Sequence, residues 1–454
     1  MLGRRDLLKS SALGFGWLAL ADLLAQAAVN DPLAPKAPHF PAKAKRIIFL
    51  FMHGGPSQVD TFDYKPKLTE HDGKPLPFAK PRVVSGATGN LLKSPFSFKQ
   101  HGQSGAWVSE LFPNIAKCVD DLCFIKSMHG SNSRHGGALL ELHTGSDTLV
   151  RPSMGSWITY GLGTENRDLP GYVSICPTLT HGGVNNYTSA FLPAIYQATP
   201  LGNAGTPSSK VGVPFVKGTT PPDQQRLELD LLAELDRERT AKDAAMDGRI
   251  QSFEMAFRMQ AAAPMVQDLS KESKETHALY GIDDKATENF GRQCLMARRF
   301  AEAGVRFIQC THSYKWDQHE NLTKGHTANA KEVDKPIAGL LMDLKRRGLL
   351  KDTLVLWGGE FGRTPVAQGK DGRDHNPHGF TMFLAGGGAK AGHSHGATDD
   401  FGYYSVEDKV HIHDLHATML HLLGLDHLKL TYRHAGRDFR LTDVHGEVVK
   451  GVLA

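Results

Sequence analysis

The stretch that decides the fold is RIIFLFMHGGPSQVDTF, residues 46–62. Its first seven residues, an arginine followed by six apolar residues, form a β-rich run, which stops at the turn His53-Gly54-Gly55-Pro56. A short apolar run that ends at glycine and proline is typical of a strand buried on both faces. Such strands occur mainly in parallel sheets that helices cover on both sides.

Three later segments repeat this pattern. We expect strands at 305–310, 353–357 and 380–384, with helices at 289–303 and 333–347 before the first two. Alternation of helix and strand predicts an α/β protein whose central sheet is mostly parallel, with helices on both faces. Ligands of such sheets bind in the loops beyond the carboxyl ends of the strands.

The N-terminal residues predict export. Arg4 and Arg5 precede an apolar stretch at 12–24, which ends in Ala25-Gln26-Ala27. We interpret 1–27 as a twin-arginine signal peptide, which implies the twin-arginine export machinery as a partner and a periplasmic or cell-envelope location. Residues 40–454 are expected to form a single α/β domain, with a loop and helical excursion at about 182–267.

The composition of the chain argues against some functions and favours metal binding. The formal net charge of +4 and the 22% of charged residues give no basic face that would indicate a nucleic-acid partner. The chain has 23 histidines, and histidine is the commonest metal ligand. Its five cysteines, an odd number without a C-x-x-C pair, argue against a disulfide framework and against a thiolate metal site.

The candidate metal ligands follow the predicted strands. The loops carry histidines and carboxylates at His53, Asp60, Asp317, His319, Glu360, Asp374 and His375. Imidazole combined with carboxylate suits one or two divalent ions, zinc best. Arg363 lies in the same loops and would suit a tetrahedral oxyanion. His378 and His395 are second-rank candidates.

Each motif also has a structural interpretation. Asp317 and His319 could form a hydrogen-bonded loop pair, and His53 could cap backbone groups beside its glycine turn. Glu360 and Arg363 could form a local ion pair of little energetic weight. Recurrence of these residue types at equivalent positions of the sheet favours a metal site.

Four blocks carry a family resemblance: HGGPSQVDTFDYKP (53–66), LVLWGGEFGRTPVAQGKDGRDHNPHGF (354–380), LAGGGAKAGHSHGATDDFGYY (384–404) and YRHAGRDFRLTDVHGEVV (432–449). The chain from about residue 45 onwards resembles the exported family called domain of unknown function fifteen-oh-one. That family is similar to the alkaline phosphatase and sulfatase superfamily, whose members hydrolyse phosphate or sulfate esters at one or two metal ions. The resemblance places Glu360 where sulfatases carry a metal-binding Asp. Phe361 replaces a second ligand, for which Asp374 or His375 would compensate.

The nucleophile segment departs from the superfamily. Sulfatases carry C-x-P-S-R-x-x-L-L-T-G, whereas this chain has HGGALLELHTG at 135–145, with no cysteine nearby. His135 could hold a metal ion that activates water, or it could attack the ester itself; alternatively Ser131, Ser133 or Thr144 attacks. We favour the first alternative. Arg134 would bind the substrate oxyanion in every case.

Together these residues predict a metal-dependent hydrolase of phosphate or sulfate esters outside the cytoplasm. Its substrate would be an anionic ester, such as that of a sulfated or phosphorylated saccharide. The altered segment at His135 supports an alternative, a non-catalytic envelope or polysaccharide-binding protein on a degenerate sulfatase-like fold.

Overall fold

A large central sheet organises the protein. The computed structural model describes residues 31–79, 86–213, 220–236 and 244–454, so the predicted signal peptide at 1–27 lies outside the described residues. In spatial order the sheet contains β13 (His393–His395), β5 (Leu122–His129), β12 (Phe380–Ala385), β9 (Thr353–Gly358), β1 (Arg46–Met52), β8 (Phe307–His312), β6 (Tyr172–Ile175) and β7 (Thr199–Leu201), and β16 (Val410–His411) also pairs with β5.

The sheet is mostly parallel, as the sequence predicts. Among its described strands only β12 runs against the others, because it pairs antiparallel with both β5 and β9. All seven residues of β1 are buried, and β1 lies between β8 and β9 at the centre of the sheet. Its apolar side chains point to both faces, so both faces must be covered.

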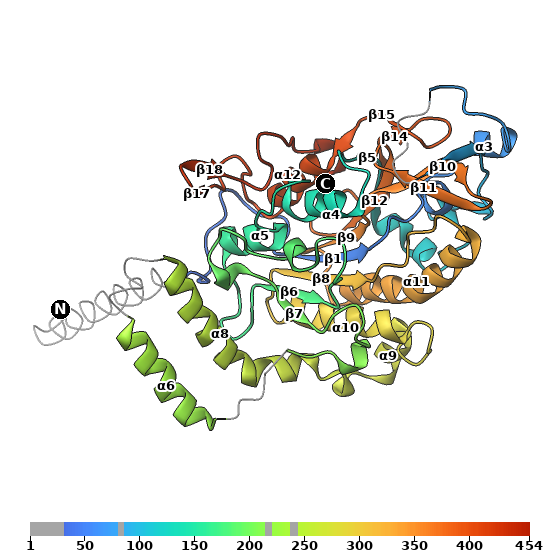
Figure 1. Cartoon of the computed structure of the whole chain (residues 1–454). Coiled ribbons are helices and arrows are strands. Elements are labelled where there is room, and N and C mark those ends of the chain that lie inside the picture. The colour runs from blue at the N-terminus through green and yellow to red at the C-terminus, as the bar shows by residue number, and fades with distance from the viewer. Residues whose placement is uncertain (1–30, 80–85, 214–219, 237–243) are drawn as a thin grey trace, which may run out of the picture.

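Helices cover the two faces (Figure 1). On one side lie α10 (Glu288–Glu302) and α11 (Leu322–Arg346), and on the other lie α4 (His135–Thr144), α5 (Met154–Leu162) and α12 (Ile412–Leu422). The prediction of helices on both faces is therefore confirmed. Helix α11 begins eleven residues before the predicted 333, because its polar first turns lack the apolar periodicity on which the prediction rested.

The region 182–267 differs in part from the prediction. Helices α6 (Pro222–Leu235) and α8 (Ala244–Gln267) are present, and α6 stands away from the sheet in Figure 1. Residues 182–223 were expected to be loop, but β7 within them pairs in parallel with β6 and forms an edge of the central sheet. A three-residue edge strand is too short to show a pattern in the sequence.

A small second sheet adjoins the main one. It contains β11 (Gly372–Asn376), β10 (Gly362–Gln368) and β2 (Thr88–Leu91) in that order. The hairpin of β10 and β11 links β9 to β12. The chain therefore leaves the central sheet at the end of β9 and returns at the start of β12, on the same edge. The antiparallel direction of β12 makes this possible, and it brings the GRDHNPHGF segment to the carboxyl ends of the parallel strands.

Shorter elements complete the described chain: α2 (Gln58–Thr61), α3 (Pro66–Glu70), β3 (Phe98–His101), β4 (Ala106–Ser109), α9 (Lys274–Tyr280), β14 (Ala397–Thr398), β15 (Ser405–Glu407), β17 (Tyr432–His434) and β18 (Arg437–Phe439). All five cysteines are buried free thiols. Among the described helices, none is both long enough and apolar enough to span a membrane.

Candidate metal centre

Histidines and carboxylates converge at the carboxyl edge of the central sheet. His53 follows β1, Asp317 and His319 follow β8, and Glu360 follows β9. His135 is the first residue of α4, which comes after β5, and His375 lies on β11 just before β12. These five segments are far apart in the sequence, yet the sheet places their ends side by side.

Glu360 orients His135. The Nδ1 of His135 lies 2.7 Å from Oε1 of Glu360, and the backbone N–H of Gly54 donates to both carboxylate oxygens, at 3.1 and 3.2 Å. Burial raises the pKa of Glu360, but the hydrogen bond and charge of His135 outweigh it and lower that pKa to about 2. Burial lowers the pKa of His135, and its contacts with Asp317 and Glu360 raise it to about 8.

Gly54 is required by the close approach of another loop. Its φ of +117° lies in the region that favours glycine, and a Cβ there would lie 2.7 Å from the backbone nitrogen of Asp317. This absence of a side chain lets the loop after β8 pack directly against the end of β1. Asp317 is thereby placed next to His135 and Glu360.

One carboxylate oxygen of Asp317 contacts all three imidazoles of the cluster. Its Oδ1 lies 2.9 Å from Nε2 of His319, 3.1 Å from Nε2 of His375 and 3.3 Å from Nε2 of His135. Arg363 donates to the same oxygen at 2.6 Å, and the hydroxyl of Tyr314 donates to Oδ2. Although burial raises the pKa of Asp317, its contacts with the three histidines and the charge of Arg363 hold that pKa well below its usual range.

The three imidazoles share one hydrogen-bonding pattern. Each Nδ1 faces an oxygen acceptor: Glu360 for His135, the carbonyl of Ser133 at 2.7 Å for His375, and the side-chain oxygen of Gln368 for His319. In a neutral imidazole whose Nδ1 donates, Nε2 carries the lone pair. The Nε2 atoms of His319 and His375 nevertheless face each other at 3.0 Å, and Nε2 of His135 is buried without a hydrogen-bond partner.

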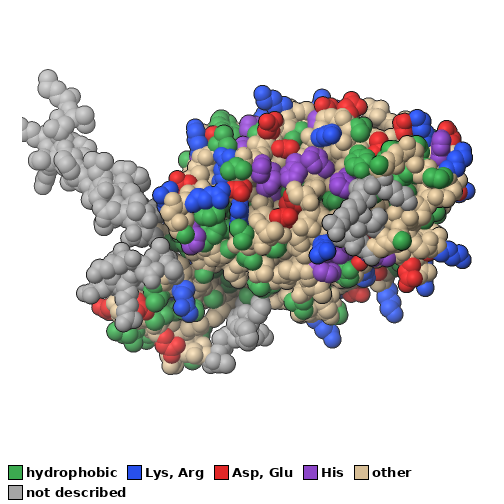
Figure 2. All heavy atoms as spheres, turned by 45° about the horizontal axis from the view of Figure 1, so that its top comes forward, with side chains coloured by type: hydrophobic (Ala, Val, Ile, Leu, Met, Phe, Trp, Pro, Cys, Tyr) green, Lys and Arg blue, Asp and Glu red, His purple; other side chains and the backbone are tan. Residues whose placement is uncertain are grey.

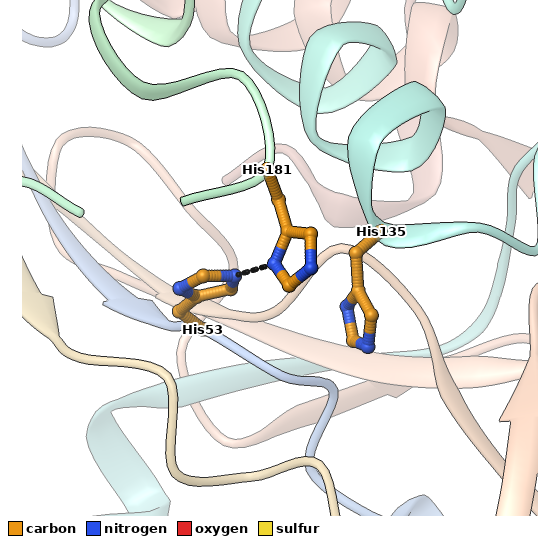
Figure 3. A group of neighbouring side chains, drawn as sticks. All are labelled: His53, His135 and His181. Atoms are coloured by element: carbon orange, nitrogen blue, oxygen red, sulfur yellow. Dashed lines mark hydrogen bonds between the residues drawn. The ribbon is translucent and has the colours of Figure 1, made fainter. Parts of the chain in front are cut away.

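A second group of imidazoles adjoins the first. His53, His135 and His181 each offer a nitrogen, and these atoms lie within 4.8 Å of one another. Figure 3 shows His53 at the end of β1, His135 at the start of α4 and His181 on a loop, with Nδ1 of His181 3.3 Å from Nε2 of His53. His53 is fully buried, its Nδ1 has no partner, and burial lowers its pKa to about 4.

These donors fit a divalent cation. In a tetrahedral zinc site with Zn–N bonds near 2.0 Å, neighbouring ligand atoms are about 3.3 Å apart. The contacts of Asp317 with His135, His319 and His375 span 2.9 to 3.3 Å. Imidazoles that bind metal usually donate their other ring N–H to a carboxylate or a carbonyl, as these do. A cation would also satisfy the lone pairs that face one another.

The sequence comparisons assign the family. The family model described as "Protein of unknown function (DUF1501)" matches residues 44–453. The chain belongs to this family. The prediction from the four sequence blocks is thereby confirmed. No curated protein matches this DUF1501 chain.

Solved structures are similar to this DUF1501 chain at low identity. They include the lipoteichoic acid synthase LtaP from Listeria monocytogenes, with 11% identity over 94% of this chain and 81% of that chain and a TM-score of 0.39. The PsFucS1 sulfatase from Pseudoalteromonas sp. has 12% identity over 84% and 68%, with a TM-score of 0.37. The alkaline phosphatase from the Antarctic bacterium TAB5 has 11% identity over 86% and 99%, with a TM-score of 0.34. Scores this low support no conclusion about the chemistry of this chain.

Asp60 lies outside the cluster, contrary to the prediction that it is a metal ligand. Both its oxygens accept from Arg373, at 2.7 and 3.1 Å, and Ser57 donates to Oδ2 at 2.5 Å. Asp60 and Arg373 are both fully buried. The sequence places Asp60 seven residues after His53, but α2 turns its side chain towards β11.

Arg363 is also placed differently from the prediction. It is fully buried, and its guanidinium donates to Asp317 and to the carbonyls of Gly54, Gly55 and Arg373. These acceptors occupy the guanidinium, so Arg363 positions Asp317 and is not available to bind a substrate oxyanion. Arg134, the N-cap residue of α4, is exposed beside His135 and keeps that role as a prediction.

The other candidate residues lie either at the cluster or away from it. Asp374 is brought to the cluster as predicted, because Asp374, His319 and His375 each offer a ligand atom and these atoms lie within 4.8 Å of one another; its Oδ1 is 3.9 Å from Nδ1 of His319. Thr144 bonds to the carbonyl of Leu140 within its own helix, and Ser131 contacts His411 at 3.1 Å, away from the cluster. His378 stacks on Tyr403, and His395 lies on the edge strand β13. These last two are not brought to the site.

Two residues of the site were missed. Tyr314 contacts Asp317, and the ring of Tyr314 lies 4.8 Å from both His53 and His181. His181 could have been found, because the sequence contains His-Gly-Gly at 53–55, 135–137 and 181–183. Each triplet supplies one member of the three-histidine group. Tyr314 carries no comparable signal.

Proposed function

We propose that this DUF1501 chain is a metal-dependent hydrolase of phosphate or sulfate esters, with zinc as its ion. One observation carries the proposal: three imidazoles with Nδ1 held by oxygen acceptors direct Nε2 at a single oxygen of Asp317. Divalent ions bound by imidazole and carboxylate polarise ester oxygens and lower the pKa of water.

The protein's own residues hold this arrangement. His135, His319, His375 and Asp317 would hold one ion, and His53 and His181 offer nitrogens for a second. Glu360 fixes the ring of His135, and Arg363 fixes Asp317. With His135 used as a ligand and Thr144 and Ser131 engaged elsewhere, we propose water as the attacking group in preference to Ser133, which contacts the cluster through its carbonyl. Tyr314, 40% exposed and hydrogen-bonded to Asp317, lies where the cluster meets solvent.

Turnover tests the proposal. Protein purified without chelator and loaded with zinc is expected to hydrolyse a generic aryl phosphate or aryl sulfate, and His375→Ala is expected to lose that activity. His395→Ala, in a histidine remote from the cluster, is the matched control and should keep it. Tight zinc binding without turnover of either ester would contradict the hydrolase and favour the non-catalytic binding protein.

Zinc loading should release protons. His135 has a pKa of about 8 and is mostly protonated at pH 7, but only the neutral ring can ligate a metal. The contact of His319 with Asp317 also raises the pKa of His319. About one proton or more should therefore leave the protein for each ion that binds at pH 7. Titration calorimetry in buffers of different ionisation enthalpy measures this number. It should fall at pH 9, where His135 is already neutral, and proton-free binding at pH 7 would contradict the assignment.

We also propose that the chain is exported as a single domain by the twin-arginine route. The paired arginines of the N-terminal segment support this proposal. Replacing Arg4 and Arg5 by lysine should leave the protein in the cytoplasm, as measured by cell fractionation. Equal export of the variant and the natural chain would contradict it.

A further inference from the structure

A further group of histidines, separate from both imidazole groups of the metal centre, surrounds the start of α12. Histidine side chains gather near the middle of the face shown in Figure 2, the side of the molecule that carries α12. A cavity of about 740 Å³ on the described chain is lined by His129, His411, His413 and His445, among others. The metal centre described above uses none of these four.

Three ligand atoms meet beside this cavity. Glu141, His411 and His413 each offer one, and these atoms lie within 4.8 Å of one another. Oε1 of Glu141 lies 3.4 Å from Nε2 of His411, close to the roughly 3.3 Å between neighbouring ligands of tetrahedral zinc. The ring of His413 stacks on that of His411, with the ring centroids 5.0 Å apart.

His413 is the member that the protein leaves unsatisfied. It is only 7% exposed, and its Nδ1 is buried without a hydrogen-bond partner. Buried polar atoms are nearly always paired, so an unpaired imidazole nitrogen beside a carboxylate and a second imidazole indicates a missing partner. A cation is a partner that satisfies all three residues together.

Hydrogen bonds already hold the other two residues in place. Ser131 donates its backbone N–H to Glu141, and its hydroxyl contacts Nε2 of His411 at 3.1 Å. Nδ1 of His411 accepts from the N–H of His413 and so caps α12. In the neutral ring this places the proton on Nε2. A cation that binds Nε2 therefore requires the other tautomer, with the proton on Nδ1, and the contact with the N–H of His413 is then lost. The positions of Glu141 and His411 are thus preformed, and binding costs one capping contact.

The group is separate from the first metal centre. Glu141 follows His135 by six residues on α4, which places it on another face of the helix and about 9 Å along the axis. The two centres share no ligand, and α4 connects them.

We propose that Glu141, His411 and His413 form a second site for a divalent first-row cation, zinc in the first instance. Two imidazoles and one carboxylate are a ligand set that zinc accepts, and the adjoining cavity leaves room for water in the fourth position. The ion would join α12 to α4 and, through Ser131, to the segment that leads into His135. The site stands independently of the proposed hydrolase activity.

Zinc stoichiometry tests the site. After dialysis of the zinc-loaded protein, His413→Gln and His411→Gln are each expected to contain one equivalent less than the natural chain by elemental analysis. His445→Gln is the matched control, since His445 is an exposed histidine of the same cavity outside the ligand group. Far-UV circular dichroism checks folding. Equal zinc in the natural chain and in folded His413→Gln would overturn the proposal.

A second measurement needs no variant to fold. In the natural chain, zinc should protect His411, whose side chain is 22% exposed, from diethyl pyrocarbonate while His445 still reacts, as read by mass spectrometry. Equal modification of His411 with and without zinc would overturn the proposal. Failure of the hydrolase proposal is distinguishable, because His375→Ala acts on the first centre and leaves the protection of His411 unchanged.

Discussion

Glu360→Gln is expected to remove the ion of the first metal centre and with it the hydrolysis of esters. The amide keeps the shape of the side chain but loses the charge that holds Nδ1 of His135 at 2.7 Å and that lies 4.0 Å from His53. Loss of a residue that orients a metal ligand costs about 10- to 100-fold in metal affinity. Zinc titration and the turnover of an aryl phosphate or sulfate measure the two effects.

Glu332→Gln is the matched control for this prediction. Glu332 is also a carboxylate near the carboxyl edge of the sheet and also contacts a histidine, with Oε2 2.9 Å from Nε2 of His312. It also pairs with Lys315 and belongs to neither metal group. The control should keep its zinc and its turnover. If Glu360→Gln behaved like Glu332→Gln, the site assigned here would be wrong.

Asp60→Ala is expected to lower the free energy of unfolding by about 3 to 5 kcal/mol and to leave zinc content unchanged. The large effect follows from the burial of both partners, since removal of Asp60 leaves the guanidinium of Arg373 in the interior without its counter-charge. Denaturant unfolding measures the change. Loss of zinc in a folded Asp60→Ala protein would instead restore Asp60 as a ligand.

Asp400→Ala gives the comparison for an exposed ion pair. Lys67 and Asp400 form a close contact, but their side chains are 48% and 65% exposed, so the pair should contribute little to the free energy of unfolding. A difference of a few kcal/mol between the two variants is therefore expected. Equal effects would contradict the importance of burial for the Asp60 pair.

The Asp60 pair also predicts a pH dependence. Burial raises the pKa of Asp60, yet the charge and hydrogen bonds of Arg373 outweigh it and lower that pKa below its ordinary value. A carboxyl whose pKa is depressed by folding stabilises the protein above its unfolded pKa of about 3.9 and loses that contribution as the pH falls through the folded value. The difference in stability between the natural chain and Asp60→Ala should therefore shrink in acid.

The local pattern of the sequence was enough to predict the fold class and four strands of the central sheet, β1, β8, β9 and β12. Six consecutive apolar residues at 47–52 favour a strand covered on both faces, and β1 is such a strand. Glycines after the strands marked the edge where the loops gather. Strands β5 and β6 were not predicted. The edge strand β7 and the first turns of α11 were also missed, because neither carries a run of apolar residues that repeats with a secondary-structure period.

The residue types of the metal centre were also predictable, but their partners were not. His53, Asp317, His319, Glu360 and His375 follow or precede strands, so their arrival at one edge follows from the topology. Whether Asp60 meets an ion or Arg373 depends on which way α2 turns, and whether Arg363 faces substrate or the carbonyls of Gly54 and Gly55 depends on how β10 packs. Sequence alone determined which chemical groups follow the predicted strands, because the apolar runs and the turns that end them are local in the chain. Only the tertiary structure decided which groups bind one another, because hydrogen bonds and ion pairs are fixed by distances between segments that are remote in the chain.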